Sequence, residues 1–240
     1  MTIDHFINPT YDNKLQAIEK LKWLPWVGVN FPDNSPEGKL LIVGESHYCP
    51  KSDPISTRNL IKKHEKNPIF TREIIWECPI WGEWRNRTLE NIAKVLLGAT
   101  KSNHQELWKG IAFYNIIQKI LEYSDQPERP TPHDFALGWD IFIKIIKIIK
   151  PSQCIFLGTE ASHSMSQAMQ LNDVSFSAPT RREKIGRCWG YRATLKIENY
   201  ELPIIFIQHP GKYFSPTAWH DYLKRELPEL MAKIQAEYPV

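Results

Sequence analysis

Two short polar segments of the chain contain the side chains best suited to chemistry. They are Gly44-Glu45-Ser46-His47-Tyr48 and Gln208-His209-Pro210-Gly211, and each begins where an apolar run stops. A carboxylate or an imidazole can accept or donate a proton near neutral pH. We therefore take Glu45, His47 and His209 as the candidate catalytic residues.

The apolar runs before these segments are typical of buried parallel strands, whose two faces are both covered. Helical patterns lie between the strands, so the chain predicts an α/β fold with a mainly parallel sheet and helices on both faces. In such sheets a site lies beyond the carboxyl ends of the strands, where both polar segments are expected. The predicted strands are Lys39–Val43, a strand around Ile111–Asn115, Gln153–Leu157, a hairpin arm at Cys188–Ile197, and Ile204–Gln208.

Helical periodicity marks the stretches between the strands. The segment Val174–Lys184 is polar and predicts an irregular connection. The predicted helices are Lys14–Leu24, Thr57–His64, Glu83–Leu97, Phe135–Ile149, a helix ending at Leu171, and Ser215–Glu237.

The length and composition are those of a globular protein with one core. A chain of 240 residues, 42% hydrophobic and 24% charged, suffices for one sizeable α/β domain. We expect a single domain over residues 1–240, with an N-terminal helical extension at about 1–38. The net charge of +3 is compatible with nucleic-acid binding but does not by itself indicate it.

The four cysteines are scattered and include no CxxC pair; they are Cys49, Cys78, Cys154 and Cys188. Zinc and iron–sulfur sites usually contain a close pair, so we expect reduced thiols, no metal and no cofactor. Phe135–Ile149 is interrupted by three charged residues, and Met1–Ile18 lacks the apolar core of a signal peptide. These features predict a cytoplasmic protein outside the membrane, which we expect to be a monomer.

Five motifs in chain order resemble those of the uracil-DNA glycosylase superfamily. That family has a strand ending in Gly-Gln-Asp-Pro-Tyr or a variant, an apolar segment carrying an Asn, a helix containing Gly-Trp, a strand ending in Gly, and a final strand ending in His-Pro-Ser. The corresponding segments here are Gly44–Tyr48, Ala112–Asn115, His133–Phe142, Ile155–Gly158 and His209–Ser215. The resemblance covers roughly residues 39–230. It implies a three-layer α-β-α sandwich with a central, mainly parallel four-stranded sheet.

The resemblance also implies a pocket for one nucleobase, which must leave the base stack to reach it. Asn115 corresponds to the family's base-reading Asn, and its amide offers both a donor and an acceptor. His209 would donate to a base carbonyl as negative charge develops there. Tyr48 corresponds to the Tyr of the pocket floor, and Phe70 is a candidate for stacking on the base. Judged from the residues alone, Asn115 could equally cap a loop, and the two aromatic side chains could belong to the core.

In the family, the loop after the final His inserts an apolar side chain into the duplex. Tyr213 is the candidate for this wedge, with Lys212 beside it to contact a phosphate. Phe214 is the alternative, but it could instead form a hydrophobic staple at the start of the last helix, with Ser215 as the cap.

A basic cluster that contains Arg181 and Arg182 is interleaved with aromatic residues. Such a mixture suits a phosphate backbone and stacked bases, although charged runs are also common on solvated surfaces. The partner expected from the resemblance and from this cluster is DNA or a nucleotide.

The chain departs from the family at the activating group. The family's Asp or Asn is replaced by Ser46, and the next residue, a Pro in the family, is His47. One reading is a DNA N-glycosylase in which Glu45 or His47 activates water, and another is a non-catalytic protein that binds a nucleobase, a nucleotide or nucleic acid. A third is a hydrolase with Ser46 as nucleophile and His47 or His209 as base. That reading needs a tight Gly-x-Ser-x-Gly turn, and Tyr48 stands where the second Gly would be.

Overall fold

The computed structural model describes residues 2–31, 38–50, 53–98, 104–124 and 127–238. Its strands are β1 (Trp26–Val27), β2 (Leu40–Gly44), β3 (His47–Pro50), β4 (Ala112–Asn115), β5 (Ile120–Tyr123), β6 (Gln153–Leu157), β7 (Ser175–Ile185), β8 (Cys188–Ile197) and β9 (Tyr200–Ile207). Its α-helices are α1 (Asp12–Gln16), α2 (Pro54–Glu65), α3 (Phe70–Ile75), α4 (Arg87–Leu97), α5 (His104–Gly110), α6 (Pro132–Ile149), α7 (Glu160–Leu171), α8 (Pro216–Glu226) and α9 (Pro228–Glu237). Shorter turns are η1 (Ile3–His5), η2 (Pro9–Tyr11) and the π-helical η4 (Trp76–Ile80).

Seven strands form one mixed sheet in the order β1-β4-β2-β6-β9-β8-β7. The central strands β4, β2, β6 and β9 are parallel, and they are the four strands predicted from the apolar runs. β1 adds to one edge, and β8 and β7 add to the other, all in antiparallel pairing. The α/β class is confirmed, whereas the expected four-stranded sheet is wrong: the sheet is seven-stranded and mixed. β3 and β5 pair separately as a small parallel sheet.

The additional strands have weak signals in the sequence for physical reasons. β1 is two residues long, too short for any periodicity. β7 was predicted to be irregular because most of its residues are polar, and in the structure most of them are exposed. It is the edge strand, and its register against β8 shifts twice, so its side chains do not alternate regularly between core and solvent.

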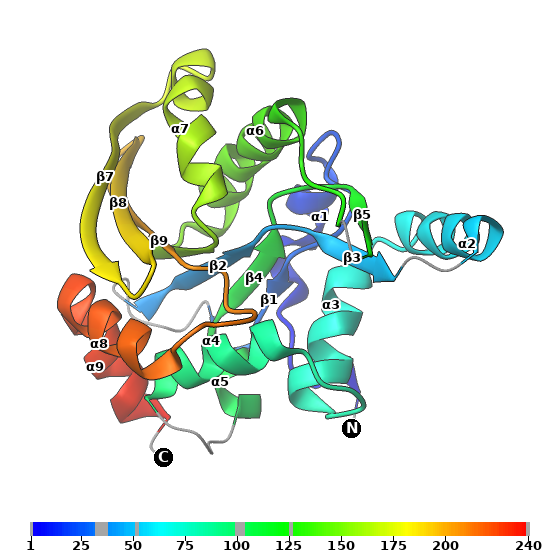
Figure 1. Ribbon diagram of the computed structural model, residues 1–240, viewed down its shortest axis with the longest axis horizontal. Coiled ribbons are helices and arrows are strands. Elements are labelled where there is room, and N and C mark those ends of the chain that lie inside the picture. The colour runs from blue at the N-terminus through cyan, green and yellow to red at the C-terminus, as the bar shows by residue number, and fades with distance from the viewer. Residues whose placement is uncertain (1, 32–37, 51–52, 99–103, 125–126, 239–240) are drawn as a thin grey trace.

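Two layers of helices cover the sheet (Figure 1). α6 and α7 lie on one face, and α4, α8 and α9 lie on the other. Side chains of β2 alternate between the two cores: Leu41 and Val43 pack with α6, and Leu40 and Ile42 pack with α4. Since both faces of the central strands are buried, their sequences read as continuous apolar runs.

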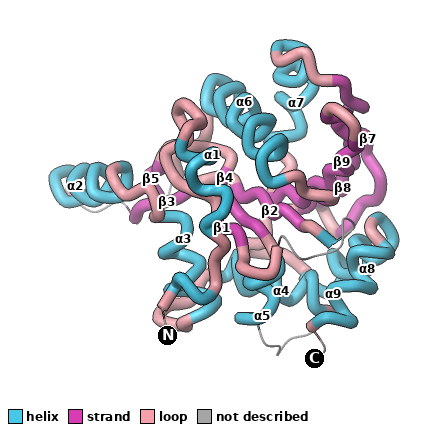
Figure 2. Tube along the Cα trace, turned by 180° about the vertical axis from the view of Figure 1, so that it is seen from behind, coloured by secondary structure: helices cyan, strands magenta, loops and turns pink. Residues whose placement is uncertain are grey.

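The N-terminal segment belongs to the same core. Figure 2 shows α1 beside α6, and Leu15 and Val27 join the cluster formed by α6. The helix predicted over Lys14–Leu24 is wrong in length, because α1 ends at Gln16 and Lys20 has a left-handed φ of 69° that no α-helix contains. Residues 32–37 of the expected extension lie outside the described residues.

Proline and capping residues set the other helix ends. The predicted helix Ser215–Glu237 is two helices, since Pro228 begins α9 directly after Leu227. In α6 the cap is Thr131, whose hydroxyl accepts from the Asp134 backbone while the Asp134 carboxylate accepts from the Thr131 backbone. These two reciprocal hydrogen bonds form a capping box.

Within the described ranges, none of the helices combines the length and the hydrophobicity needed to cross a bilayer.

A buried ion pair attaches the N-terminal segment to α3. Arg72, whose side chain is 3% exposed, makes a bidentate contact with Asp12, with Nη2–Oδ1 and Nη1–Oδ2 distances of 2.6 and 2.9 Å. Its Nε also donates to the carbonyl of Pro25. We expect Arg72→Met to lower the free energy of unfolding by about 3–5 kcal/mol, because it leaves a partly buried carboxylate and a carbonyl without partners. Urea denaturation measures this change.

Arg85 provides the matched control. It makes a similar bidentate contact with Glu90, but its side chain is 87% exposed. Arg85→Met should lower the free energy of unfolding far less than Arg72→Met does, because solvent screens an exposed ion pair. Equal losses for the two variants would contradict the assignment of Arg72 as the attachment point.

Candidate functional site

A cavity of about 730 Å³ lies at the carboxyl ends of the central strands. Its lining includes the last residues of β2, β4 and β6 and the segment after β9. The chain leaving β2 continues to the face covered by α4, whereas the chain leaving β4 continues to the face covered by α6. Neighbouring strands whose connections diverge in this way leave a crevice between them, which is where α/β proteins bind ligands. The volume is within the usual range for ligand sites.

Three predicted site residues meet in this cavity: Glu45, Asn115 and His209 all line it. Glu45 follows β2, Asn115 ends β4, and His209 follows β9. His47 and Tyr48 line it too, from the start of β3. Segments that are up to about 165 residues apart in the chain thus contribute to one site.

Close packing of the strand ends positions Asn115. Gly44 and Asn115 are opposite each other in the β2–β4 register, and a Cβ atom on Gly44 would lie 2.1 Å from Asn115 Oδ1. On the other face, Gly138 of α6 approaches Ile116 so closely that a Cβ would lie 2.5 Å from its carbonyl oxygen. Any larger side chain at either glycine would displace the Asn115 segment.

His47 forms a hydrogen bond with the side-chain amide of Asn115. Asn115 Nδ2, which can only donate, lies 3.2 Å from His47 Nδ1, so Nδ1 accepts. The proton of the ring is then on Nε2, which donates to Thr71 Oγ1 at 2.8 Å. Burial, together with the nearby His64, lowers the pKa of His47 to about 3. A neutral ring with both nitrogens occupied suits the positioning of Asn115 better than the general-base role suggested by the sequence.

Glu45 is fixed from two sides. Its Oε2 accepts from the Tyr48 hydroxyl at 2.6 Å, and its Oε1 pairs with Arg129 Nη2 at 2.9 Å. Desolvation and the Glu45 carboxylate raise the pKa of Tyr48 above its usual value, so the phenol remains a donor. Glu45 is therefore an oriented carboxylate at the cavity wall.

His209 faces the cavity from the turn after β9. Its carbonyl accepts from the Gly211 backbone at 2.7 Å, and Asn91 of α4 donates to the carbonyl of Pro210 at 2.9 Å. Figure 1 shows this loop, in orange, beside α4. The surrounding protein lowers the pKa of His209 by desolvation, the Glu45 charge raises it, and Arg129 lowers it further. The net direction favours a neutral imidazole that can donate one N–H.

Ser46 also lines the cavity, but its hydroxyl contacts backbone carbonyl groups. Its Oγ donates to the Lys119 carbonyl at 2.6 Å and lies 3.1 Å from the His47 carbonyl. The His47 ring is directed to Thr71 and Asn115 instead. The pairing of Ser46 with His47 that a serine hydrolase needs is therefore not formed.

Phe70 lies outside the cavity lining. Its ring stacks on His64 with centroids 4.0 Å apart, and it also contacts His47 and Trp23. This side chain supports His47 from the protein side, so the structure does not bring it to a bound base.

The two aromatic residues of the loop after His209, Tyr213 and Phe214, lie in different environments. Phe214 stacks on Trp219 with centroids 6.1 Å apart, and the Ser215 side chain accepts from the Ala218 backbone. This is the hydrophobic staple with its cap, one of the two alternatives for Phe214. Tyr213 is 86% exposed, has a left-handed φ of 62° and lies beneath the ammonium of Lys212. Neither Tyr213 nor Lys212 is part of the cavity lining.

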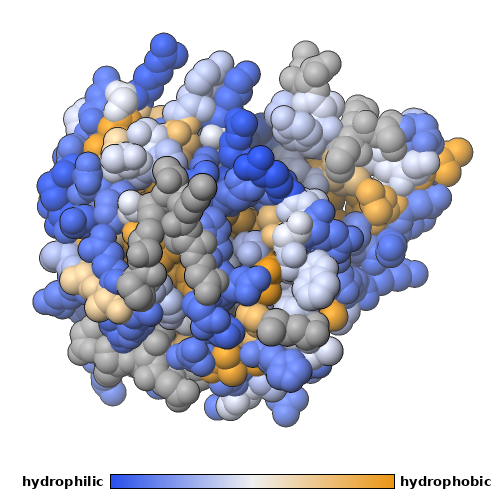
Figure 3. Space-filling view, turned by 90° about the horizontal axis from the view of Figure 1, so that it is seen from below, coloured by the Kyte–Doolittle hydropathy of each residue, from blue (hydrophilic) through white to orange (hydrophobic). Residues whose placement is uncertain are grey.

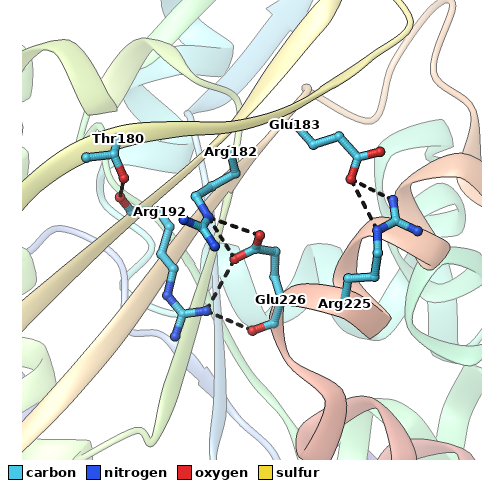
Figure 4. A network of polar contacts seen from close by, with 6 residues as sticks. All are labelled: Thr180, Arg182, Glu183, Arg192, Arg225 and Glu226. Carbon is cyan, nitrogen blue, oxygen red and sulfur yellow. Dashed lines mark hydrogen bonds and ion pairs between the residues drawn. The ribbon is translucent and has the colours of Figure 1, made fainter.

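The predicted basic cluster is largely engaged with other protein groups. Arg182 of β7 and Arg192 of β8 both pair with Glu226 of α8, as Figure 4 shows. Arg225 in turn pairs with Glu183. Arg181 lies over the ring of Trp189 at 5.6 Å. The ion pairs join the edge hairpin to α8 and reduce the positive charge that this surface offers to DNA.

Several charged and aromatic side chains of the cavity lining were not predicted as site residues. Trp84 and Arg85 precede α4, Arg87 begins it, Tyr123 ends β5, and Arg129 precedes α6. The helix predicted over Glu83–Leu97 included Trp84, Arg85 and Arg87, but α4 begins only at Arg87. Periodicity does not indicate where side chains at or beyond the end of an element point.

Among the described residues, no group of three or more His, Cys, Asp or Glu side chains is arranged to hold a metal ion. In comparisons with known proteins, no protein-family model and no curated protein matches this chain.

The buried neutral His47 predicts a pH-dependent stability. Below pH 6.5 the unfolded chain protonates this imidazole, whereas the folded protein keeps it neutral down to about pH 3. Because the unfolded state then binds the extra proton, stability falls as the pH falls. Between pH 7.5 and pH 5 we expect His47 to account for about 2 kcal/mol of lost stability, measured by urea denaturation.

His47→Gln is the control, since it lacks this titration and should lose about 2 kcal/mol less over the same range. Burial also lowers the pKa values of His64, His104 and His209, and these residues contribute to both proteins. An identical loss in the two proteins would contradict a neutral His47 in the folded state.

Proposed function

We propose that this protein is a uracil-DNA glycosylase-like enzyme that takes one damaged or deaminated base of DNA into the cavity and hydrolyses its N-glycosidic bond. The observation that carries the proposal is the meeting of Glu45, Asn115 and His209 in one cavity. An oriented carboxylate, an amide and a neutral imidazole are suited to activate water, read a base edge and stabilise a leaving base.

The arrangement of the strands supports the proposal. Four of the five segments that resemble the family lie on or directly after the four central strands, and the polar residues there lie at one edge of the sheet. The Gly-Trp pair of the third motif also has a local role here. Gly138 allows the close approach to Ile116, and Trp139 is fully buried.

Each side chain would then have a distinct part in the reaction. Glu45 accepts a proton from water as the water oxygen bonds to the sugar carbon, and its charge stabilises the cationic sugar. The bond from that carbon to the base nitrogen breaks, and the electron pair moves to the base. His209 donates a hydrogen bond to the base oxygen on which this charge develops. Asn115, held by His47, hydrogen-bonds the edge of the base.

A second candidate is a protein that binds the base and does not hydrolyse the bond. Two observations favour it: Ser46 offers no carboxylate, and Arg129 and Tyr48 already bind the two oxygens of Glu45. A water molecule would have to compete with these two partners for the carboxylate.

A strand-cleavage assay tests the enzymatic proposal. Oligonucleotides with one uracil or one hypoxanthine are incubated with the protein and treated with hot alkali, which breaks the chain at abasic sites. We expect cleavage by the wild type, and a rate at least about 100-fold lower for Glu45→Gln and for His209→Ala.

Glu160→Gln is the control, because Glu160 is an exposed residue at the start of α7 and lies outside the cavity lining. Its rate should equal that of the wild type. Oligonucleotide binding without any cleavage would favour the second candidate, and equal cleavage by Glu45→Gln would remove Glu45 from the mechanism.

A further inference from the structure

Two aromatic side chains stand where the cavity opens to solvent. Trp84 is 39% exposed and Tyr123 is 61% exposed, and both are part of the cavity lining. They come from separate segments, one before α4 and one at the end of β5. Exposed aromatic residues beside a ligand cavity offer ring surface to whatever enters it.

The orientation of each ring is set by a neighbour. Trp84 Nε1 donates to Glu77 Oε2 at 3.3 Å. Tyr123 meets Tyr48 edge to face, with centroids 6.3 Å apart and an interplanar angle of 86°. Rings that are already oriented lose little conformational freedom when a ligand stacks on them.

Positive charge accompanies the rings. Arg85, Arg87 and Arg129 line the same cavity, and Glu45 is the only Asp or Glu among the described residues that line it. Arg87 is exposed and, within the described part of the chain, makes no hydrogen bond or ion pair. Arg85 and Arg129 each have one carboxylate partner, yet their side chains are 87% and 59% exposed. The opening therefore attracts an anionic ligand.

The partner that fits rings and arginines together is a strand with unstacked bases. In duplex DNA each base is covered by its neighbours, and only base edges and the backbone are accessible. In a single strand the base faces are free to stack on aromatic side chains while arginines contact the phosphates. On the face shown in Figure 3, hydrophilic residues predominate and hydrophobic ones form small separate patches, so that face offers no broad apolar surface for a protein partner.

We propose that the protein prefers single-stranded DNA, with Trp84 and Tyr123 stacking on the bases that flank the one in the cavity. This inference rests on the proposed function for the identity of the polymer. It differs from the duplex mode implied by a wedge at Tyr213, which lies outside the cavity lining. The two modes assign the aromatic contacts to different residues and can be separated by substitution.

Fluorescence anisotropy with labelled single-stranded and duplex oligonucleotides of the same sequence tests the preference. We expect the single strand to bind at least about 10-fold more tightly. Trp84→Ala and Tyr123→Ala should each weaken single-strand binding by about 10-fold, whereas Trp84→Phe, which keeps a ring, should lose much less. Trp81→Ala is the matched control: Trp81 is 60% exposed on the same segment but lies outside the cavity lining, so binding should not change.

Equal or tighter binding of the duplex would overturn the single-strand assignment. A loss of binding in Tyr213→Ala but not in Trp84→Ala would overturn it as well. Tighter binding of an RNA strand of the same sequence would also overturn it. If duplex substrates are cleaved in any of those cases, the proposed hydrolysis still holds and only the strand preference is wrong. If the single strand binds but is not cleaved, only the proposed hydrolysis is wrong.

Discussion

The contact between Gly44 and the Asn115 amide is the constraint on which the site depends. It joins the ends of two neighbouring parallel strands at a distance that admits no side chain on Gly44. From Asn115 a chain of hydrogen bonds continues through His47 to Thr71, at the start of α3. On the opposite face, Gly138 of α6 packs against the next residue, Ile116. Contacts from α3 and α6 therefore both restrict the position of this one amide.

Neutral polar groups lie deep in the site, and charged groups lie nearer to its opening. His47 is buried and neutral, and each of its nitrogens has a partner. The charged pair of Glu45 and Arg129 lies further out, where Arg129 is mostly exposed. Burying an unpaired charge costs free energy, so the polar groups deep in the site are neutral. The charged side chains lie at the opening, where water can solvate them. This arrangement suits a ligand with a polar, neutral base and an anionic backbone.

The sequence predicted the central strands and the three converging residues because continuous apolar runs mark strands buried on both faces, and their ends share one edge. It failed where signals are short or depend on partners. β1 has two residues, and β7 has polar faces because it is an edge strand. Phe70 and Arg182 have the right chemistry for a site, but their contacts with His64 and Glu226 are decided by tertiary packing. Trp84 lies just before α4 and Arg87 is its first residue, and helical periodicity does not indicate where side chains at a helix end point.

The same geometry bears on the missing carboxylate at position 46. Ser46 donates to the Lys119 carbonyl and lies close to the His47 carbonyl, so a carboxylate at this position would face two oxygen atoms that cannot donate to it. Glu45 points instead to Tyr48 and Arg129, which stabilise its negative charge. The loop is thus built for an acidic group at position 45 and not at position 46. In the proposed reaction the acidic group is therefore Glu45, and Arg129 and the sugar would compete for its carboxylate.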